Sequence, residues 1–276
     1  MFDPIGTSFP PFGGRSPEAE AARLGFRLGN KGTHTSRTIM LEELRAVLEH
    51  CKPDAGRDDY LSAIHEDNSL GKRTLATRKL SSQRLSELYA LDPEVPLFLA
   101  MRRCWYADHR HGQALLALLL GLARDPLLRV TAPAIFRMRP GEELARQQVT
   151  DALSRAVGDR LNEDVLDKVV RNTASSWTQS GHLEGRGRKT RRRVAPTAAS
   201  TAFALMLGHL SGVRGAALFE TLWAQTLDAP PGELLQLAIE ARRLGFVDMS
   251  HSGGVVEVGF SRLLAPDERR RAYGKS

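Results

Sequence analysis

An uncharged stretch, PTAASTAFALMLGHLSGV at 196–213, constrains the fold more than any other part of the sequence. So long an uncharged run is stable only inside a protein core or a lipid bilayer. It contains His209, several hydroxyl side chains and many small residues, which favour packing inside a protein. A second apolar run, QALLALLLGLA at 113–123, is too short to cross a bilayer. The sequence therefore predicts buried helices and no membrane partner.

Helical periodicity dominates the rest of the chain. Apolar residues follow the spacing of a helix face in TSRTIMLEELRAVLEHC, and prolines stand near expected helix starts, as at Pro96 and Pro133. Strand-like alternation occurs in FVDM and VVEVGF, with a turn sequence between them. The pattern predicts a mainly α fold, a helical bundle with helix-turn-helix and winged-helix-like elements and short β-hairpins. Strands are expected only at about 183–195 and 246–260.

Changes in composition divide the 276 residues into segments, a length typical of one or two domains. The beginning is rich in Pro and Gly, the middle is strongly apolar, and the end is charged. The predicted organisation is an extended N-terminal arm at 1–32, a helix-turn-helix-like unit at 33–92, a helical core at 93–160, a winged-helix-like basic segment with a C-terminal helix–hairpin module at 161–264, and a charged tail at 265–276.

The unit at 33–92 reads as three short helices with a basic third helix, which is the order of a helix-turn-helix. Leu80, Leu85 and Leu88 are expected on the apolar side of the third helix. An ordinary solvated face explains its cations equally well. The candidate nucleic-acid contacts in this unit are Lys72, Arg73, Arg78, Lys79 and Arg84.

A dense basic run, RGRKTRRR at 186–193, follows a helix expected over 162–183. Six of its eight residues are Lys or Arg, and the whole chain carries a formal charge of +7. A helix followed by a basic hairpin is the layout of a recognition helix and its wing, and a positive surplus favours nucleic acid as partner. A solvated loop is the competing interpretation of the run.

The winged-helix interpretation names contacts on both elements. Polar side chains of the helix would reach a groove or the phosphates, and the cations would pair with phosphates. Trp177, in the same helix, is expected in the core rather than stacked on a base. The candidates are Thr173, Ser175, Ser176, Thr178 and Gln179 on the helix, and Arg186, Arg188, Lys189, Arg191, Arg192 and Arg193 on the wing.

Motifs for catalysis and for cofactors are missing from the sequence. GRKT at 187–190 lacks the first glycine of a phosphate-binding loop, and HRHG at 109–112 has no further ligands at metal-site spacing. No GxSxG, HExxH or kinase signature occurs. The sequence therefore predicts a non-enzymatic protein with no cofactor and no metal.

Cysteine usage bears on the compartment. Cys51 and Cys104 are far apart and form no zinc-type pair, which is typical of reduced cysteines in a cytosol. The beginning, MFDPIGTSFPPFGG, has neither the basic nor the apolar region of a signal peptide. A cytoplasmic protein is the expectation.

Three stretches together resemble the BrxA family, small proteins of the bacterial phage-resistance (BREX) islands. They are HTSRTIMLEELRAVL, NSLGKRTLATRKLSSQRLSELYAL and KVVRNTASSWTQSGHLEGRGRK, and the resemblance spans roughly residues 33–260. It implies a mostly helical fold with winged-helix-like elements, an association with DNA, and other components of the defence system as partners. This chain departs from the family in its greater length and its denser basic run.

The leading functional hypothesis is a protein that binds double-stranded DNA through the basic wing and the helix-turn-helix elements. Two alternatives stay open. One is an RNA-binding, antitermination-like factor of the same helical type. The other is a scaffold whose basic loop docks an acidic protein.

Overall fold

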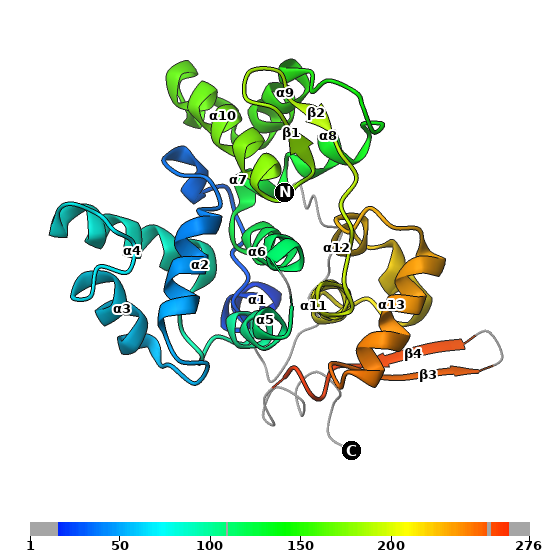
Figure 1. The fold of residues 1–276 in the computed structure, drawn as a ribbon. Helices are drawn as coiled ribbons and strands as arrows, with labels where there is room; N and C mark the ends of the chain where they lie inside the picture. Colours follow the sequence, from blue (N-terminus) through cyan, green and yellow to red (C-terminus); the bar gives the residue numbers. More distant parts are fainter. Residues whose placement is uncertain (1–15, 109, 253–254, 265–276) are drawn as a thin grey trace.

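Helices dominate the structure, a computed structural model that describes residues 16–108, 110–252 and 255–264 (Figure 1). Two small antiparallel sheets of two strands each accompany them. The predicted mainly α fold is confirmed, and the strands lie in the two regions where they were expected. The charged tail at 265–276 and the first part of the predicted arm lie outside the described residues.

The N-terminal arm is not extended throughout, and that prediction is wrong for α1 (Pro17–Leu24). Ser16 accepts a hydrogen bond from the backbone of Ala19, Pro17 occupies the first turn, and Gly25 ends the helix with a φ of 110°. Phe26 then enters the core, where its ring centroid lies 6.1 Å from that of Trp223. The composition suggested an arm, but standard capping residues close a short helix here.

Three helices follow in the predicted order, after the 3-10 turn η1 (Thr33–Thr35). They are α2 (Leu41–His50), α3 (Arg57–His65) and α4 (Leu75–Tyr89). Leu85 and Leu88 of α4 are buried, as predicted. Leu80 is 40% exposed, so the prediction that it lies on the apolar side is wrong. Helix α4 packs between α3 and the central helix α6, so this unit projects from the side of the molecule (Figure 1).

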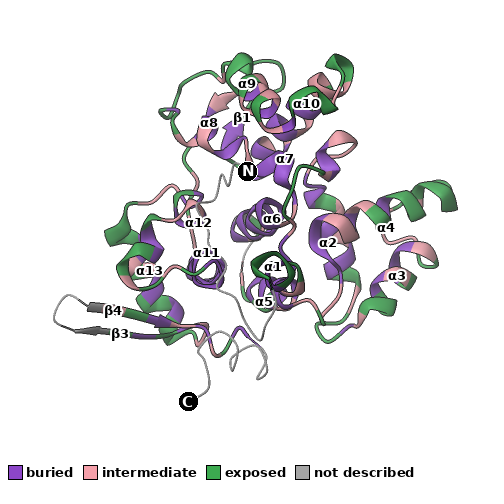
Figure 2. Cartoon of the chain, turned by 180° about the vertical axis from the view of Figure 1, so that it is seen from behind, coloured by how far each residue is buried: buried purple, intermediate pink, exposed green. Residues whose placement is uncertain are grey.

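The centre of the molecule is built from α5 (Pro96–Tyr106), α6 (Arg110–Arg124) and α11 (Ala198–Leu210), which pack against one another. All 13 residues of α11 are buried, as Figure 2 shows for the middle of the fold. The prediction of a buried helix over 196–213 is therefore confirmed. Among the described residues, no helix combines the length and the apolar character that a membrane crossing requires.

A second, smaller hydrophobic core lies beside the first, and residues of α9 and α10 form most of it. Val149 and Leu153 pack there against Val169 and Val170. Asn162 accepts a hydrogen bond from the backbone of Val165 and begins α10, as the sequence indicated. The elements of this part are α7 (Pro126–Arg129), α8 (Ala132–Phe136), α9 (Arg146–Val157), η2 (Gly158–Arg160), α10 (Glu163–Gln179), β1 (Leu183–Glu184) and β2 (Thr190–Arg191).

The C-terminal module packs on the other side of α11. It consists of η3 (Gly215–Glu220), α12 (Leu222–Gln225), α13 (Pro231–Arg243), β3 (Asp248–Ser252) and β4 (Val255–Gly259). The two strands pair in antiparallel register, and β4 also contacts η3. Helix α13 and the hairpin β3–β4 follow one another in this module, and α13 also contacts β3.

We expect the buried side chains of α11 to contribute strongly to the free energy of unfolding. Replacing Phe203, which is fully buried, by Ala should lower the free energy of unfolding by about 3–5 kcal/mol, because a large cavity is left. Leu244→Ala is the matched control, since Leu244 is 62% exposed and its loss should cost no more than about 0.5 kcal/mol. Urea unfolding followed by circular dichroism measures both. Similar losses in the two variants would contradict the packing described here.

Candidate nucleic-acid interface

The basic run forms a hairpin directly after α10. Leu183 pairs with Arg191 and Glu184 with Thr190, so β1 and β2 run antiparallel. Gly185 makes the turn possible, because its φ is +98° and an added Cβ would lie 2.1 Å from a backbone oxygen. We call residues 183–193 the wing.

A third segment braces the wing from its outer edge. The backbone N–H of Gly141 donates to Arg191, and that of Leu144 donates to Lys189, at 2.9 and 2.7 Å. The N–H of Arg191 in turn donates to the carbonyl of Glu142. The segment 141–144 therefore pairs with β2 through a single β-bridge, between Glu143 and Thr190, so the backbone of the wing is held along both edges of β2.

Arg191 is a structural residue, and its prediction as a phosphate contact is wrong. Its side chain is only 4% exposed and forms an ion pair with Asp228. It also donates to the carbonyls of Ile135 and His182. A buried guanidinium is stable only with such a full set of partners, so it cannot turn outward to bind phosphate without leaving Asp228 unpaired.

The remaining cations of the wing differ in how far their side chains are exposed to solvent. Lys189 is half-buried and donates to the Thr178 hydroxyl at 2.8 Å, and burial lowers the pKa of its ammonium group. By contrast, the other four cations are exposed on the surface. They are Arg186, Arg188, Arg192 and Arg193.

Carboxylates stand beside two of the exposed cations. Glu143 lies 3.8 Å from Nε of Arg188, and Glu184 lies 3.5 Å from Nε of Arg192. All four side chains are more than half exposed, so these pairs contribute little to stability. They would compete with a phosphate for the same guanidinium groups.

The helix α10 does not offer the polar face that was predicted for it. Thr173 and Ser176 are fully buried, and their hydroxyls donate to backbone carbonyls one turn earlier. Gln179 accepts from the N–H of Leu41 at the start of α2 and donates to Thr38. The prediction that Thr173 and Ser176 contact nucleic acid is wrong, because both side chains are buried. Gln179 is half-buried with its amide engaged in the protein, and its contact with nucleic acid stays a prediction.

Two further helix candidates, Ser175 and Thr178, are half-buried. The Thr178 hydroxyl donates to the carbonyl of Ala174 and accepts from Lys189, so it is already satisfied. Trp177 is fully buried, and its indole N–H donates to Thr131 at 2.8 Å, which confirms its predicted place in the core.

Ser176 belongs to an arrangement that resembles a catalytic triad. His34 Nδ1 lies 2.8 Å from Asp125 and His34 Nε2 lies 2.8 Å from the Ser176 hydroxyl. Serine proteases use this order of groups to activate the serine. Here all three residues have no exposed surface, and the Ser176 hydroxyl also accepts the N–H of Ile39. We therefore assign the three residues a structural role, which is to connect distant segments of the chain by buried hydrogen bonds. No local sequence motif predicts this role, because the three residues are far apart in sequence.

Asp125 is the centre of this arrangement. Its carboxylate accepts hydrogen bonds from the backbone N–H groups of Thr33, His34, Leu127 and Leu128 as well as from the His34 ring. Burial acts to raise the pKa of Asp125, but His34 and the backbone donors outweigh it and hold the pKa below its ordinary value. Asp125 is therefore a buried anion stabilised by its donors.

The predicted cations of the first helical unit are divided in the same way. Lys72 pairs with Glu43 at 3.0 Å, and Arg84 pairs with Glu87 at 2.8 Å. Arg78 donates to the carbonyl of His65 and ties α4 to the end of α3. Arg73 and Lys79 are exposed and form no ion pair within the part of the chain that the structure describes.

Sequence reasoning missed two cations beside the wing. Arg137 and Arg139 are exposed and precede the segment 141–144 in the chain. The backbone of that segment pairs with β2, so the two arginines belong to the stretch of chain that leads to the wing. A shallow hollow of about 270 Å³ also opens there, lined by Pro140, Gly141, Glu184, Arg191, Arg192 and Arg193.

Metal ligands do not gather anywhere in the described ranges, where no group of three or more His, Cys, Asp or Glu residues could hold an ion. Part of HRHG lies outside these ranges.

A scan against protein-family models gives no match to this chain, and a search of curated proteins gives none either.

The first prediction from this site concerns Asp125. Asp125→Asn should lower the free energy of unfolding by about 3–5 kcal/mol, because the new amide group would face N–H donors in the core. Asp151→Asn is the control, since Asp151 is exposed and its carboxylate accepts from the exposed Gln147. Urea unfolding at neutral pH measures both, and equal losses would refute the role given to Asp125.

The second prediction concerns pH. Burial lowers the pKa of His182 to about 4, the Arg191 charge adds to this, and Asp228 opposes it. The unfolded chain binds a proton below its ordinary pKa of about 6.5, whereas the folded chain does not until pH 4. The free energy of unfolding should therefore decrease as the pH falls from about 6.5 to about 4, by about 3 kcal/mol for this residue alone.

The control for the pH effect is His182→Gln, whose amide can still donate to the carbonyl of Thr226 as His182 Nε2 does. The variant should show a shallower decline between pH 6.5 and 4 than the natural chain. The measurement is a series of urea unfolding curves across this range. Parallel curves for the two proteins would assign the pH dependence to other groups.

Proposed function

We propose that the protein binds duplex DNA through the wing. The observation that carries the proposal is the group of four exposed arginines on a hairpin braced along both edges of β2. Exposed like charges so close together repel one another and add nothing to folding, whereas each phosphate contact would neutralise one and release a counterion. Arg137 and Arg139, also exposed, lie just before the segment that pairs with β2.

The mode of binding follows from what α10 lacks. In the C-terminal half of this helix Thr173, Ser176 and Trp177 are buried, and Thr178 and Gln179 hydrogen-bond within the protein, so few of its polar groups are free to read a major groove. Contacts from the wing would reach phosphates, which position a protein on DNA but carry no base sequence. We therefore propose non-enzymatic binding with little sequence preference, driven mainly by charge.

The biological setting is proposed from the resemblance to the BrxA family alone. On that basis the protein would act in the cytoplasm with other components of a bacterial phage-defence system of the BREX type. The basic wing supports DNA binding independently of this assignment.

A pair of charge-matched variants tests the proposal. Arg192→Ala with Arg193→Ala should weaken duplex DNA binding and reduce the slope of log affinity against log salt by about two units. Arg242→Ala with Arg243→Ala removes the same charge from the exposed end of α13 and should leave the slope unchanged. Fluorescence anisotropy at several salt concentrations measures both. Equal slopes would show that the wing is not the site.

Removing the neighbouring carboxylates should act in the opposite direction. Glu143→Gln with Glu184→Gln frees Arg188 and Arg192 and should tighten DNA binding by up to about fivefold. Competition by duplex RNA of the same sequence distinguishes the RNA-binding alternative. If neither nucleic acid binds and an acidic protein does, the wing serves as a docking loop instead.

A further inference from the structure

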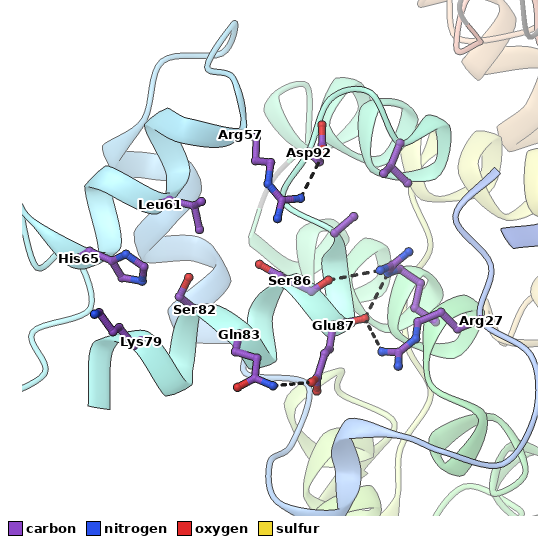
Figure 3. Close-up of a pocket in the computed structure, with 13 residues that line it drawn as sticks. Arg27, Arg57, Leu61, His65, Lys79, Ser82, Gln83, Ser86, Glu87 and Asp92 are labelled. Carbon is purple, nitrogen blue, oxygen red and sulfur yellow. Dashed lines mark hydrogen bonds and ion pairs between the residues drawn. The ribbon is translucent and has the colours of Figure 1, made fainter. Parts of the chain in front are cut away.

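A cleft of about 580 Å³ lies between α3 and α4, on the unit that projects from the side of the molecule (Figure 3). Helix α3 lines it with Arg57, Leu61 and His65, which are spaced four residues apart and so share one face. Helix α4 contributes Lys79 and Ser82 from its facing side. The volume is within the range of about 300–1,000 Å³ that small-molecule sites occupy.

The arginines at one end of the cleft are already engaged. Arg124 donates to the carbonyls of Gly25, Ser86 and Glu87. Arg27 also donates to the carbonyl of Glu87 (Figure 3). These contacts satisfy carbonyl groups at the C-terminal end of α4, where cations are favourable. This end is therefore structural.

Charges next to it are also balanced. Arg57 pairs with Asp92 at 3.3 Å, and the Glu87 carboxylate accepts from Arg84 and Gln83. Neither carboxylate is therefore left to repel an anion in the rest of the cleft.

The donors at the other end have no partner among the described residues. His65 Nε2 is enclosed and makes no hydrogen bond, and the Ser82 hydroxyl makes none either. Lys79 is exposed and forms no ion pair there. Figure 3 shows these three side chains gathered at the same end of the cleft. A buried polar atom without a partner is costly, and a His65 ring that carries its proton on Nε2 would donate to an anionic oxygen placed there.

Apolar side chains complete the cleft. Leu61, Ala90 and Val95 line it together with the polar groups. A ligand that fits would therefore carry an anionic group at one end and an apolar or aromatic part at the other.

We propose that this cleft binds a phosphorylated small molecule of about the size of a nucleotide. Its phosphate would accept hydrogen bonds from Lys79, Ser82 and His65, and three donors match the three terminal oxygens of a phosphomonoester. Its apolar part would lie against Leu61 and Val95. This site is separate from the wing and does not depend on the proposed DNA binding.

Calorimetric titration with adenosine 5′-monophosphate, ribose 5-phosphate and inorganic phosphate tests the proposal, with adenosine as the ligand that lacks the phosphate. We expect binding of the nucleotide and none of adenosine. Lys79→Ala should weaken nucleotide binding by about tenfold or more. Arg73→Ala removes the same charge from an exposed position of the same unit that does not line the cleft, and should have no effect.

Ser82→Ala provides a second variant within the cleft, and circular dichroism confirms that each variant is folded. The proposal is overturned if none of the three phosphate compounds binds at millimolar concentration, or if Lys79→Ala and Arg73→Ala behave alike. It is also overturned if Lys79→Ala weakens duplex DNA binding and not nucleotide binding, because the cleft would then hold a DNA backbone. Arg192→Ala with Arg193→Ala in the wing should leave nucleotide binding unchanged. The proposal for the cleft and the proposal for the wing can therefore fail independently.

Discussion

The carboxylate of Asp125 is the interaction on which the arrangement of the protein depends. It joins the turn at 33–34, the start of α7 and, through His34, the C-terminal half of α10. These segments meet only if five N–H donors find their acceptor, and burial makes an incomplete set costly. The same interaction decides which face of α10 is hidden. Ser176 must point toward His34, so Thr173 and Trp177 point into the protein with it.

A second buried pair, Arg191 with Asp228, does for the wing what Asp125 does for α10. One arginine of the basic run is drawn into the protein, and the strand that carries it is fixed between β1 and the segment 141–144. Alternation along the strand then leaves its neighbour Arg192 on the surface. In the dense positive run one arginine thus anchors the hairpin, while Arg186, Arg188, Arg192 and Arg193 stay exposed.

The sequence predicted those features that depend on local pattern. The apolar content of α11, the cap at Asn162 and the two hairpins are all properties of short segments, and the structure confirms them. The site was predicted less well. Whether Arg191 or Arg192 is exposed depends on Asp228, which is more than 30 residues away, and the hydroxyl of Ser176 has its partner 142 residues away. No period or motif reports such partners, and for the same reason the pairing of 141–144 with β2 was not predicted.

A continuous set of contacts runs from the cleft to the wing, but its physical character argues against communication between them. Glu87, at the edge of the cleft, accepts from the Thr33 hydroxyl, and the Thr33 N–H donates to Asp125. From Asp125 the contacts pass through His34 to Ser176 and α10, which leads into the wing. Coupling between two sites requires an element with two stable arrangements that both ligands bias. The groups at the centre of this set are fully buried, and each donor has its acceptor, so a second arrangement would leave buried polar groups unsatisfied. The network is therefore a rigid support, and occupation of the cleft is expected to leave the affinity of the wing for DNA unchanged.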